Sequence, residues 1–438
     1  MLPRSVLPLS GFALSVLPLC GLARQTPAPE PGFTRLFDGA SLAGWVTKGG
    51  HYDGDADWKV EEGCIVGRQG PDGAGGLLYT ERAYAAFELR LEVKLDRPFD
   101  SGVFLRMAPE GKGAQVTLDW RDDGEIGAIY ADGFLQHNEK GAALFRADAW
   151  NELVVRCTGF DMHVQAWLNG ERLADYQLEE DSPGYAPTGL IGLQVHGERG
   201  DTGAARFRNI RLRELPLFGE EHFTAHSSGR LELTQPGREA GWLPLFDGES
   251  LAGWEVDGPA DRYRTKGGML SFLAKGEGGD LRTKTDFVDF RLRLDFRIAR
   301  MANSGLFLRA ARDGSNPAFS GCEVQILDDF DWETVTKTKL APWQFTGSLY
   351  GAVPPREHAL RPLGEWNSYE ILYRGPRLAV ALNGRTLYDV DTTALTPESG
   401  EPFAKRVEKG FIGLQHHGSE NIADEVLIDF RNLFVQGL

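Results

Sequence analysis

The chain of 438 residues is too long for one ordinary hydrophobic core, and its length favours two or three domains. Hydrophobic residues make up 42% and charged residues 25% of the sequence, which is typical of soluble globular proteins. The formal net charge of −16 leaves no basic stripe to pair phosphates, which excludes nucleic acid or an anionic membrane surface as the main partner.

Residues 1–23 have the pattern of a secretory signal peptide. Arg4 supplies a positive charge ahead of an apolar run, and small residues near position 23 offer a cleavage site. The run is short and interrupted by prolines, so we expect no membrane insertion. The sequence predicts a secreted or periplasmic protein with a disordered spacer at residues 24–32. Lipoprotein processing at Cys20 is a less favoured alternative, because bulky Leu19 precedes the cysteine.

Three cysteines follow the signal, at Cys64, Cys157 and Cys322. An odd and sparse count gives no disulfide framework, and no metal-type cysteine spacing is present. Cys64 and Cys157 are close enough in the sequence to share one domain and pair, but burial as three small apolar side chains is favoured.

The remainder of the sequence is an internal duplication. The segment LFDGASLAGW at 36–45 returns as LFDGESLAGW at 245–254, and SGVFLR at 101–106 returns as SGLFLR at 304–309. The short motifs WN, LNG, GxIGLQxHG and FRN recur in the same order. The duplication predicts a first domain at 33–216, a linker rich in Pro, Gly and Ser at 217–240, and a second domain at 241–438.

The pattern between these landmarks is β throughout. Residues 87–95 and 290–298 alternate apolar and polar side chains, as a strand with one buried face does. The pairs Asn169-Gly170 and Asn383-Gly384 predict two-residue hairpin turns, because both residue types tolerate positive φ. Many short strands separated by turns predict two all-β domains of the sandwich or jelly-roll class.

One strand motif, present in both copies, places polar residues on the same face of the strand. Gln194 and His196 share a face in the first copy, and Gln415 and His417 share a face in the second. The recurrence indicates a functional site. The alternative is a strand end whose Gln and His satisfy neighbouring backbone groups.

Together the motifs resemble the 3-keto-disaccharide hydrolase family. They comprise LFDG…W, SGxFLR, EVQILD at 323–328, GSLYG at 347–351, EWN at 365–367, LNG, GxIGLQxHG and FRN. The resemblance covers both copies and implies two tandem concanavalin-like jelly-roll β-sandwich domains. It also implies cleavage of glycosides oxidised at C3.

The chemistry of such a substrate fits the residues. Ordinary glycosidases need two carboxylates flanking the bond, whereas the predicted strand at 323–328 places Glu323, Gln325 and Leu327 on one face. A ketone at C3 acidifies the C2 proton, so one base and one group that holds the enolate allow the aglycone to leave by elimination. Water addition then completes a net hydrolysis. The rival function is a non-catalytic carbohydrate-binding, lectin-like module.

The predicted catalytic residues all belong to the second copy. Glu323 is the base, His417 the acid or second base, Arg309 the cation for the enolate, and Tyr350 the donor to the leaving oxygen. Substrate-binding candidates in the second copy are Gln325, Gln415, Trp332, Lys339 and Trp343. Those in the first copy are Gln115, Arg106, Tyr130 and His196.

The two copies differ at the decisive position. Gln115 replaces Glu323 in the first copy, and an amide cannot act as a base. The first copy is therefore expected to bind substrate or support its partner. The sequence identifies no definite cofactor, and the acidic runs at 53–57 and 328–331 leave a divalent metal such as calcium as an alternative to acidic turns.

Overall fold

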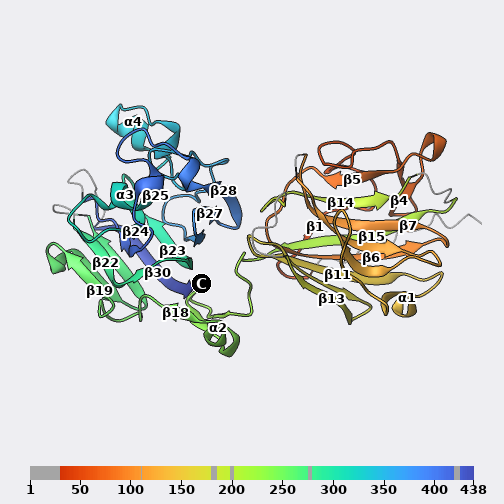
Figure 1. Cartoon of the computed structure of the whole chain (residues 1–438), viewed down its shortest axis with the longest axis horizontal. Coiled ribbons are helices and arrows are strands. Elements are labelled where there is room, and N and C mark those ends of the chain that lie inside the picture. Colours follow the sequence, from red (N-terminus) through yellow and green to blue (C-terminus); the bar gives the residue numbers. More distant parts are fainter. Residues whose placement is uncertain (1–29, 110, 179–184, 198–201, 275–278, 419–424) are drawn as a thin grey trace, which may run out of the picture.

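Alternating side chains build the central strands of both units. In β6 (Phe87–Leu95) and β23 (Phe290–Ile298), apolar residues at every second position are buried. A strand of this kind hides one face, so two sheets must pack against each other. The computed structural model describes residues 30–109, 111–178, 185–197, 202–274, 279–418 and 425–438. It shows two sandwiches side by side, the first coloured red to yellow-green and the second green to blue (Figure 1).

The first unit has two antiparallel sheets around one core. The larger sheet has the order β13 (Glu171–Gln177), β12 (His163–Leu168), β11 (Asn151–Thr158), β6, β15 (Ala205–Glu214), β4 (Cys64–Arg68) and β3 (Asp57–Glu61), with β1 (Thr34–Arg35) beside β15. The other sheet has the order β10 (Phe134–Gln136), β9 (Ile126–Tyr130), β8 (Ala114–Asp119), β7 (Asp100–Met107), β14 (Leu190–Val195), β5 (Gly76–Thr80) and β2 (Trp45–Val46). Both sheets contribute to a single cluster of buried side chains.

The second unit repeats this arrangement. Its larger sheet has the order β20 (Tyr263–Lys266), β21 (Met269–Leu273), β30 (Val426–Gly437), β23, β26 (Asn367–Arg374), β27 (Arg377–Leu382) and β28 (Arg385–Asp391), with β18 (Trp242–Pro244) beside β30. The smaller sheet has the order β19 (Trp254–Asp257), β22 (Asp280–Phe287), β29 (Gly410–Leu414), β24 (Asn303–Ala310) and β25 (Cys322–Leu327). The predicted all-β jelly-roll sandwich class is confirmed.

Turns and short helices connect the strands. Asn169 and Asn383 have φ of 52° and 54° in two-residue hairpins, as the sequence predicts. The α-helices are α1 (Gly141–Leu144), α2 (Gln235–Glu239), α3 (Pro317–Ser320) and α4 (Trp332–Thr336). Single 3-10 turns lie at Pro71–Gly73, Ala260–Arg262, Pro342–Gln344, Thr392–Ala394 and Phe403–Lys405. No helix among the described residues has the length and apolarity to cross a membrane. The three cysteines at 64, 157 and 322 are free and buried.

The two units differ beside the last strand of their smaller sheets. The first unit continues past β8 with β9 and β10, whereas the second leaves β25 into a long loop that carries α4. This loop returns to the sheet edge through a bridge between Val324 and Leu349. The segment that carries the binding candidates Trp332, Lys339 and Trp343 therefore lies at the edge of the smaller sheet.

The segment 217–240 was expected to be a linker, but the structure gives it β16 (Phe223–Ala225), β17 (Leu231–Leu233) and α2. It packs on the outer side of the larger sheet of the second unit. The Phe223 ring lies 5.3 Å from Trp242 and 5.0 Å from Phe434, measured between centroids. Phe218 joins the same buried cluster. Burial of aromatic rings outweighs the turn-rich composition of this segment.

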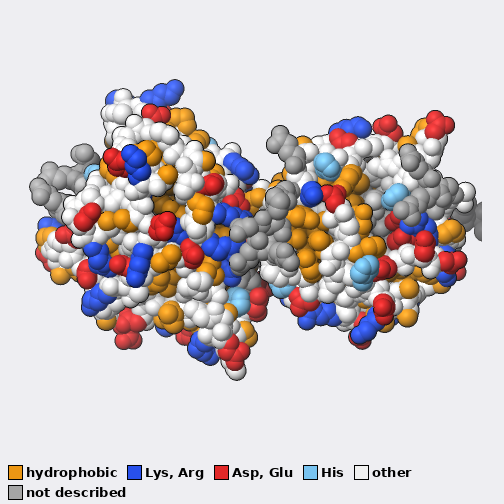
Figure 2. Space-filling view, viewed as in Figure 1, with side chains coloured by type: hydrophobic (Ala, Val, Ile, Leu, Met, Phe, Trp, Pro, Cys, Tyr) orange, Lys and Arg blue, Asp and Glu red, His pale blue; other side chains and the backbone are white. Residues whose placement is uncertain are grey.

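Polar contacts fasten the two units at the same junction. Both carboxylate oxygens of Glu370 on β26 accept 3.0 Å hydrogen bonds, one from the Leu217 backbone N–H and one from that of Phe218. Arg377 of the second unit pairs with Asp161 of the first. Figure 2 shows basic side chains gathered on the second unit where it faces the first. Since Glu370 is 3% exposed, its bonds lie inside the junction.

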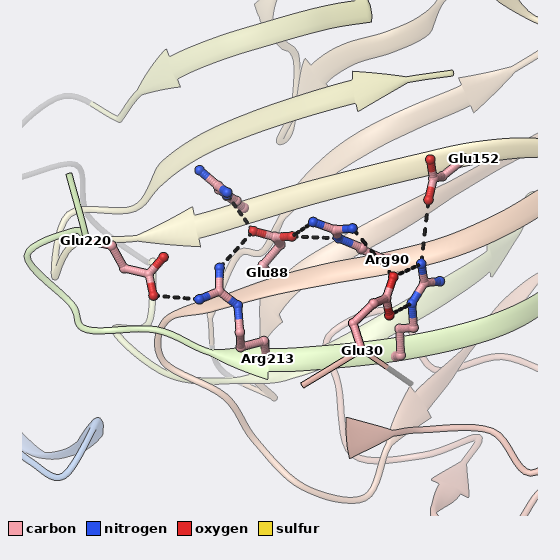
Figure 3. A network of polar contacts seen from close by, with 8 residues as sticks. Glu30, Glu88, Arg90, Glu152, Arg213 and Glu220 are labelled. Carbon is pink, nitrogen blue, oxygen red and sulfur yellow. Dashed lines mark hydrogen bonds and ion pairs between the residues drawn. The ribbon is translucent and has the colours of Figure 1, made fainter. Parts of the chain in front are cut away.

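In the first unit, the outer side of the larger sheet carries a network of charged side chains in place of the aromatic cluster (Figure 3). Fully buried Glu88 accepts hydrogen bonds from Arg90 at 2.6 Å, Arg156 at 2.7 Å and Arg213 at 3.2 Å. Burial opposes ionisation, but these arginines lower the pKa of Glu88 overall.

The start of the described chain is held by the same network. Glu30 falls within the spacer expected at 24–32, yet its carboxylate pairs with Arg211 at 2.6 Å. Residues 24–29, the predicted signal at 1–23 and Cys20 lie outside the described residues, so secretion and lipoprotein processing remain predictions.

Replacing Glu370 should loosen the junction. In Glu370→Ala two buried backbone N–H groups lose their acceptor, and we expect the free energy of unfolding to fall by about 2 kcal/mol in urea titrations. Glu408→Ala is the control, because Glu408 is exposed. Equal stability of the two variants would show that these hydrogen bonds do not hold the units together.

Candidate active site

The outer face of the smaller sheet in the second unit is defined here as the face turned away from the core. Leu306, Val324 and Ile412 point into the core, so their neighbours along each strand point outward. The register pairs Gly305 with Gln325, and Phe307 with both Glu323 and Gly413. The outward residues are Asp280, Arg282, Gly305, Phe307, Glu323, Gln325, Gly413 and Gln415.

Glu323 lies on this face with its carboxyl group over Gly305 of the neighbouring strand. A Cβ atom at Gly305 would lie 2.1 Å from the Glu323 Oε1 atom, so glycine leaves the space that this carboxyl group occupies. The side chain is 4% exposed, and no described residue donates a hydrogen bond to its carboxylate. Burial, and then the negative charge of Asp280, raise the pKa of Glu323 from 4.5 to about 8. Glu323 is therefore mostly protonated at neutral pH and becomes a strong base near pH 8.

Asp280 is a second carboxylate on the same face, which corrects the expectation of a lone carboxylate. It begins β22 beside Gln415, because the next residue, Leu281, pairs with Leu414. Its Oδ1 atom accepts a 3.1 Å hydrogen bond from the His416 backbone N–H. Burial raises the pKa of Asp280, while the charges of Arg282 and His417 oppose that shift.

Arg282 supplies a cation on the outer face. Its guanidinium lies 5.3 Å from the centre of the Phe411 ring and pairs with the Asp257 carboxylate. Its Nε atom is buried and has no hydrogen-bond partner among the described residues. The sequence reasoning missed both Asp280 and Arg282. The available signal was the contrast with the first unit, where Leu77 and Tyr79 occupy these register positions.

Several predicted site residues do lie near Glu323. The Tyr350 backbone N–H donates to the Glu323 carbonyl at 2.9 Å, and the Tyr350 ring meets Trp343 edge-on at 5.1 Å. The Gln415 backbone N–H donates to the Gly305 carbonyl at 2.9 Å. Gln325 pairs directly with Gly305, although its Oε1 atom also accepts a 3.0 Å hydrogen bond from the backbone of the next residue.

His416 and His417, which follow β29, face opposite sides of the smaller sheet. His416 is buried, and its Nε2 atom lies 2.7 Å from the Leu273 carbonyl. His417 is exposed, and its charge acts on Asp280. The alternation therefore holds beyond the last residue of β29, and His417 remains the candidate acid.

The structure corrects the assignment of Arg309 to the enolate. Its guanidinium donates to the Gly375 carbonyl at 2.7 Å and to the Asp289 carboxylate at 2.8 Å, and lies 3.6 Å from the Tyr373 ring centre. Arg309 has φ of 50° at a register shift in the strand pair, which turns the side chain away from the outer face. Arg309 therefore braces the sandwich.

Arg106, its counterpart in the first unit, also leaves the predicted binding set. It is fully buried with φ of 51°, and its Nε atom donates to the Ala85 carbonyl at 2.5 Å. Two further binding candidates lie in the long loop. Trp332 packs against the core as a loop anchor, and Lys339 is exposed without a hydrogen bond or ion pair to the described residues.

The equivalent face of the first unit has no acid at the Glu323 position. Gln115 lies over Gly102 and donates a 2.6 Å hydrogen bond to the Gln194 Oε1 atom. Gln115, Tyr130 and His196 line a cleft of about 580 Å³ on this face. The His196 Nδ1 atom lies 2.7 Å from the Gly197 carbonyl, so this histidine serves the backbone locally.

The acidic runs named for calcium hold backbone groups. Asp53 accepts from the Gly49 and Gly50 N–H groups, and Asp328 accepts from those of Phe330 and Asp331. Within the part of the chain that the structure describes, no three His, Cys, Asp or Glu side chains come together as a metal site would require. Calcium binding stays an untested prediction.

Replacing the buried carboxyl group should stabilise the fold at alkaline pH. Because the folded state holds the Glu323 proton above the pH at which the unfolded chain releases it, stability falls as pH rises from 4.5 to about 8. Glu323→Gln should therefore gain up to about 5 kcal/mol relative to wild type between pH 5 and pH 8.5 in urea unfolding. Glu408→Gln is the exposed control. A pH-independent difference for Glu323→Gln would contradict the raised pKa.

Comparisons with known proteins agree with the motif pattern. The family model for the 3-keto-alpha-glucoside-1,2-lyase-like domain matches residues 32–213 and again 241–436. A curated protein of Bacteroides thetaiotaomicron, named 3-keto-disaccharide hydrolase, is 26% identical over 236 residues, which cover 45% of this chain and 79% of that protein.

Two solved structures from Parabacteroides distasonis are each similar to somewhat less than half of this chain. A crystal structure at 1.70 Å of a candidate glycosyl hydrolase from Parabacteroides distasonis is 24% identical, with a TM-score of 0.39, and covers 47% of this chain and 98% of that chain. Another from this organism, at 2.13 Å, is 30% identical, with a TM-score of 0.35, covering 45% and 84% of the two chains. Because the family model matches each unit almost from end to end, this chain belongs to the 3-keto-alpha-glucoside-1,2-lyase-like family.

Proposed function

We propose that the second unit cleaves glycosides whose sugar ring carries a ketone at C3. Support comes from the family match to residues 241–436 and from the Bacteroides relative named 3-keto-disaccharide hydrolase. The observation that carries the proposal is Glu323, a buried carboxyl group with a pKa of about 8 over a glycine floor. A base in this range suits removal of a proton acidified by an adjacent ketone.

The reaction proceeds by elimination and then addition of water. The Glu323 carboxylate takes the C2 proton, and the electron pair of that C–H bond forms the enolate of the C3 ketone. The enolate collapses to a C1–C2 double bond as the C1–O bond breaks, and the aglycone oxygen leaves with a proton. Water adds across the double bond, with hydroxyl to C1 and a proton to C2. The sum is the 3-keto sugar and the free alcohol.

The remaining outer-face residues take supporting roles in this scheme. Arg282 is the cation that stabilises the enolate oxygen, in place of Arg309. His417 or the Tyr350 hydroxyl donates the proton to the leaving oxygen, and the Gln325 and Gln415 amides bind sugar hydroxyls. The rival function, carbohydrate binding without cleavage, is favoured only for the first unit, where Gln115 and Leu77 replace both carboxylates.

The first test is turnover of a 3-keto-disaccharide beside its unoxidised parent. Wild type should release the aglycone from the keto compound alone, and Glu323→Gln should lower kcat by about a hundredfold to ten-thousandfold. Glu408→Gln is the matched exposed control. Binding of the keto compound without cleavage by wild type would establish the lectin-like alternative. Near-full activity of folded Glu323→Gln would refute the base assignment.

The second test is the pH dependence of kcat/KM. Because only ionised Glu323 accepts the C2 proton, activity should rise with pH and level off above about 8. Asp280→Asn removes a negative charge that raises the pKa of Glu323, so the rising limb should move to lower pH. An unchanged limb in Asp280→Asn, or activity that falls through pH 8 in wild type, would contradict this role of Glu323.

A further inference from the structure

The cleft of the first unit has the size and position of a ligand site. It lies on the outer face of the sheet that contains β7, β8 and β14, and its volume of about 580 Å³ falls within the usual range of roughly 300–1,000 Å³ for small-molecule sites. Gln115 and Thr117 at its floor are 5% and 6% exposed. The floor is therefore built from buried polar side chains, and an open cavity stands above them.

Aromatic rings form the walls of this cleft. Tyr52 and Phe134 are 37% and 47% exposed, so part of each ring faces solvent. Each ring is nevertheless held in place. The Tyr52 hydroxyl donates to Asp132 at 2.9 Å and its ring lies 5.6 Å from Phe104. Phe134 meets Tyr130 edge-on at 5.3 Å and stacks on the His137 ring at 4.4 Å, so one of its two faces is left for a ligand. Fixed aromatic faces that remain open to solvent are suited to stacking on the C–H faces of sugar rings.

The charge of the lining restricts the ligand. Five carboxylates, from Asp53, Asp100, Asp119, Asp123 and Glu125, line the cleft together with one guanidinium, that of Arg121. The Arg121 group is itself shared between the Asp100 and Asp119 carboxylates. A uronic acid or a sulfated sugar would meet net negative charge, whereas the hydroxyl groups of a neutral sugar can donate to carboxylates.

The cleft lacks a carboxyl group at the position of the proposed base. Gln115 takes the position of Glu323, and its amide donates to Gln194. Leu77 takes the position of Asp280. A sugar held here would meet no carboxyl group at the position of the proposed base Glu323 or of Asp280.

We propose that the first-unit cleft binds a stretch of neutral oligosaccharide, with Tyr52 and Phe134 as stacking platforms, and does not cleave it. The proposal rests on the proposed function only in taking carbohydrate as the ligand class. Because contacts through Glu370 and Arg377 fasten the two units, a glycan bound in this cleft would remain tethered beside the second unit.

The test is calorimetric titration of the full chain carrying Glu323→Gln with neutral and acidic tetrasaccharides. The neutral probes are cellotetraose, maltotetraose and xylotetraose, and the acidic probe is tetragalacturonate. Tyr52→Ala and Phe134→Ala are introduced singly. Trp167→Ala is the matched control, because Trp167 is a half-buried aromatic on the other sheet of the same unit, stacked on Arg156. Thermal unfolding verifies that each variant is folded.

We expect at least one neutral tetrasaccharide to bind, with affinity about tenfold weaker in Tyr52→Ala and in Phe134→Ala and unchanged in Trp167→Ala. Tetragalacturonate should not bind. Absence of neutral binding, binding that both cleft variants retain in full, or equal binding of tetragalacturonate would overturn the proposal. If wild type fails to cleave a 3-keto-disaccharide while a neutral tetrasaccharide still binds to the cleft, the proposed function is refuted and this inference stands.

Discussion

The Glu323 carboxyl group is held over Gly305, where no described residue pairs with it as a cation. A side chain at Gly305 would expel it, and no described residue donates to its oxygens. An isolated buried carboxylate is unfavourable, so the fold keeps the proton until about pH 8. The sandwich must supply the compensating stability, and its continuous core of two packed sheets does so. A buried carboxyl group with a strongly raised pKa is typical of a reactive site.

The duplicated scaffold carries different chemistry on the same two surfaces. On the outer face of the smaller sheet, the pair Glu323 and Asp280 corresponds to Gln115 and Leu77 in the first unit. On the opposite side, the network around Glu88 corresponds to a junction in the second unit that combines an apolar cluster with the contacts of Glu370 and Arg377. The backbone register of these central strands is common to both copies, so on this face the copies diverge in outward side chains and beyond the edge strands β8 and β25. One copy can therefore keep a reactive carboxyl group while the other keeps an open cleft.

The sequence predicted the side-chain orientations that follow from strand alternation, and the prediction failed where that alternation is interrupted. Strand periodicity placed Glu323 and Gln325 on one face, and Asn-Gly pairs located the hairpins. The assignment of Arg309 was wrong because a positive φ and a register shift rotate that residue out of phase. Asp280 was missed because its strand meets Glu323 only through two intervening strands. The structured segment at 217–240 was missed because its aromatic residues gain burial from contacts with the two units, which are distant in sequence.

The most direct measurement is infrared titration of the Glu323 carboxyl group, read as the carboxylate band that wild type has and Glu323→Gln lacks. It observes the ionisation itself, without substrate or turnover. An apparent pKa of about 8 would confirm that the protein holds a strong, desolvated base on the outer face of the second unit. An apparent pKa near the ordinary 4.5 would contradict the account, because Glu323 would then be a solvated carboxylate without the basicity that proton abstraction requires.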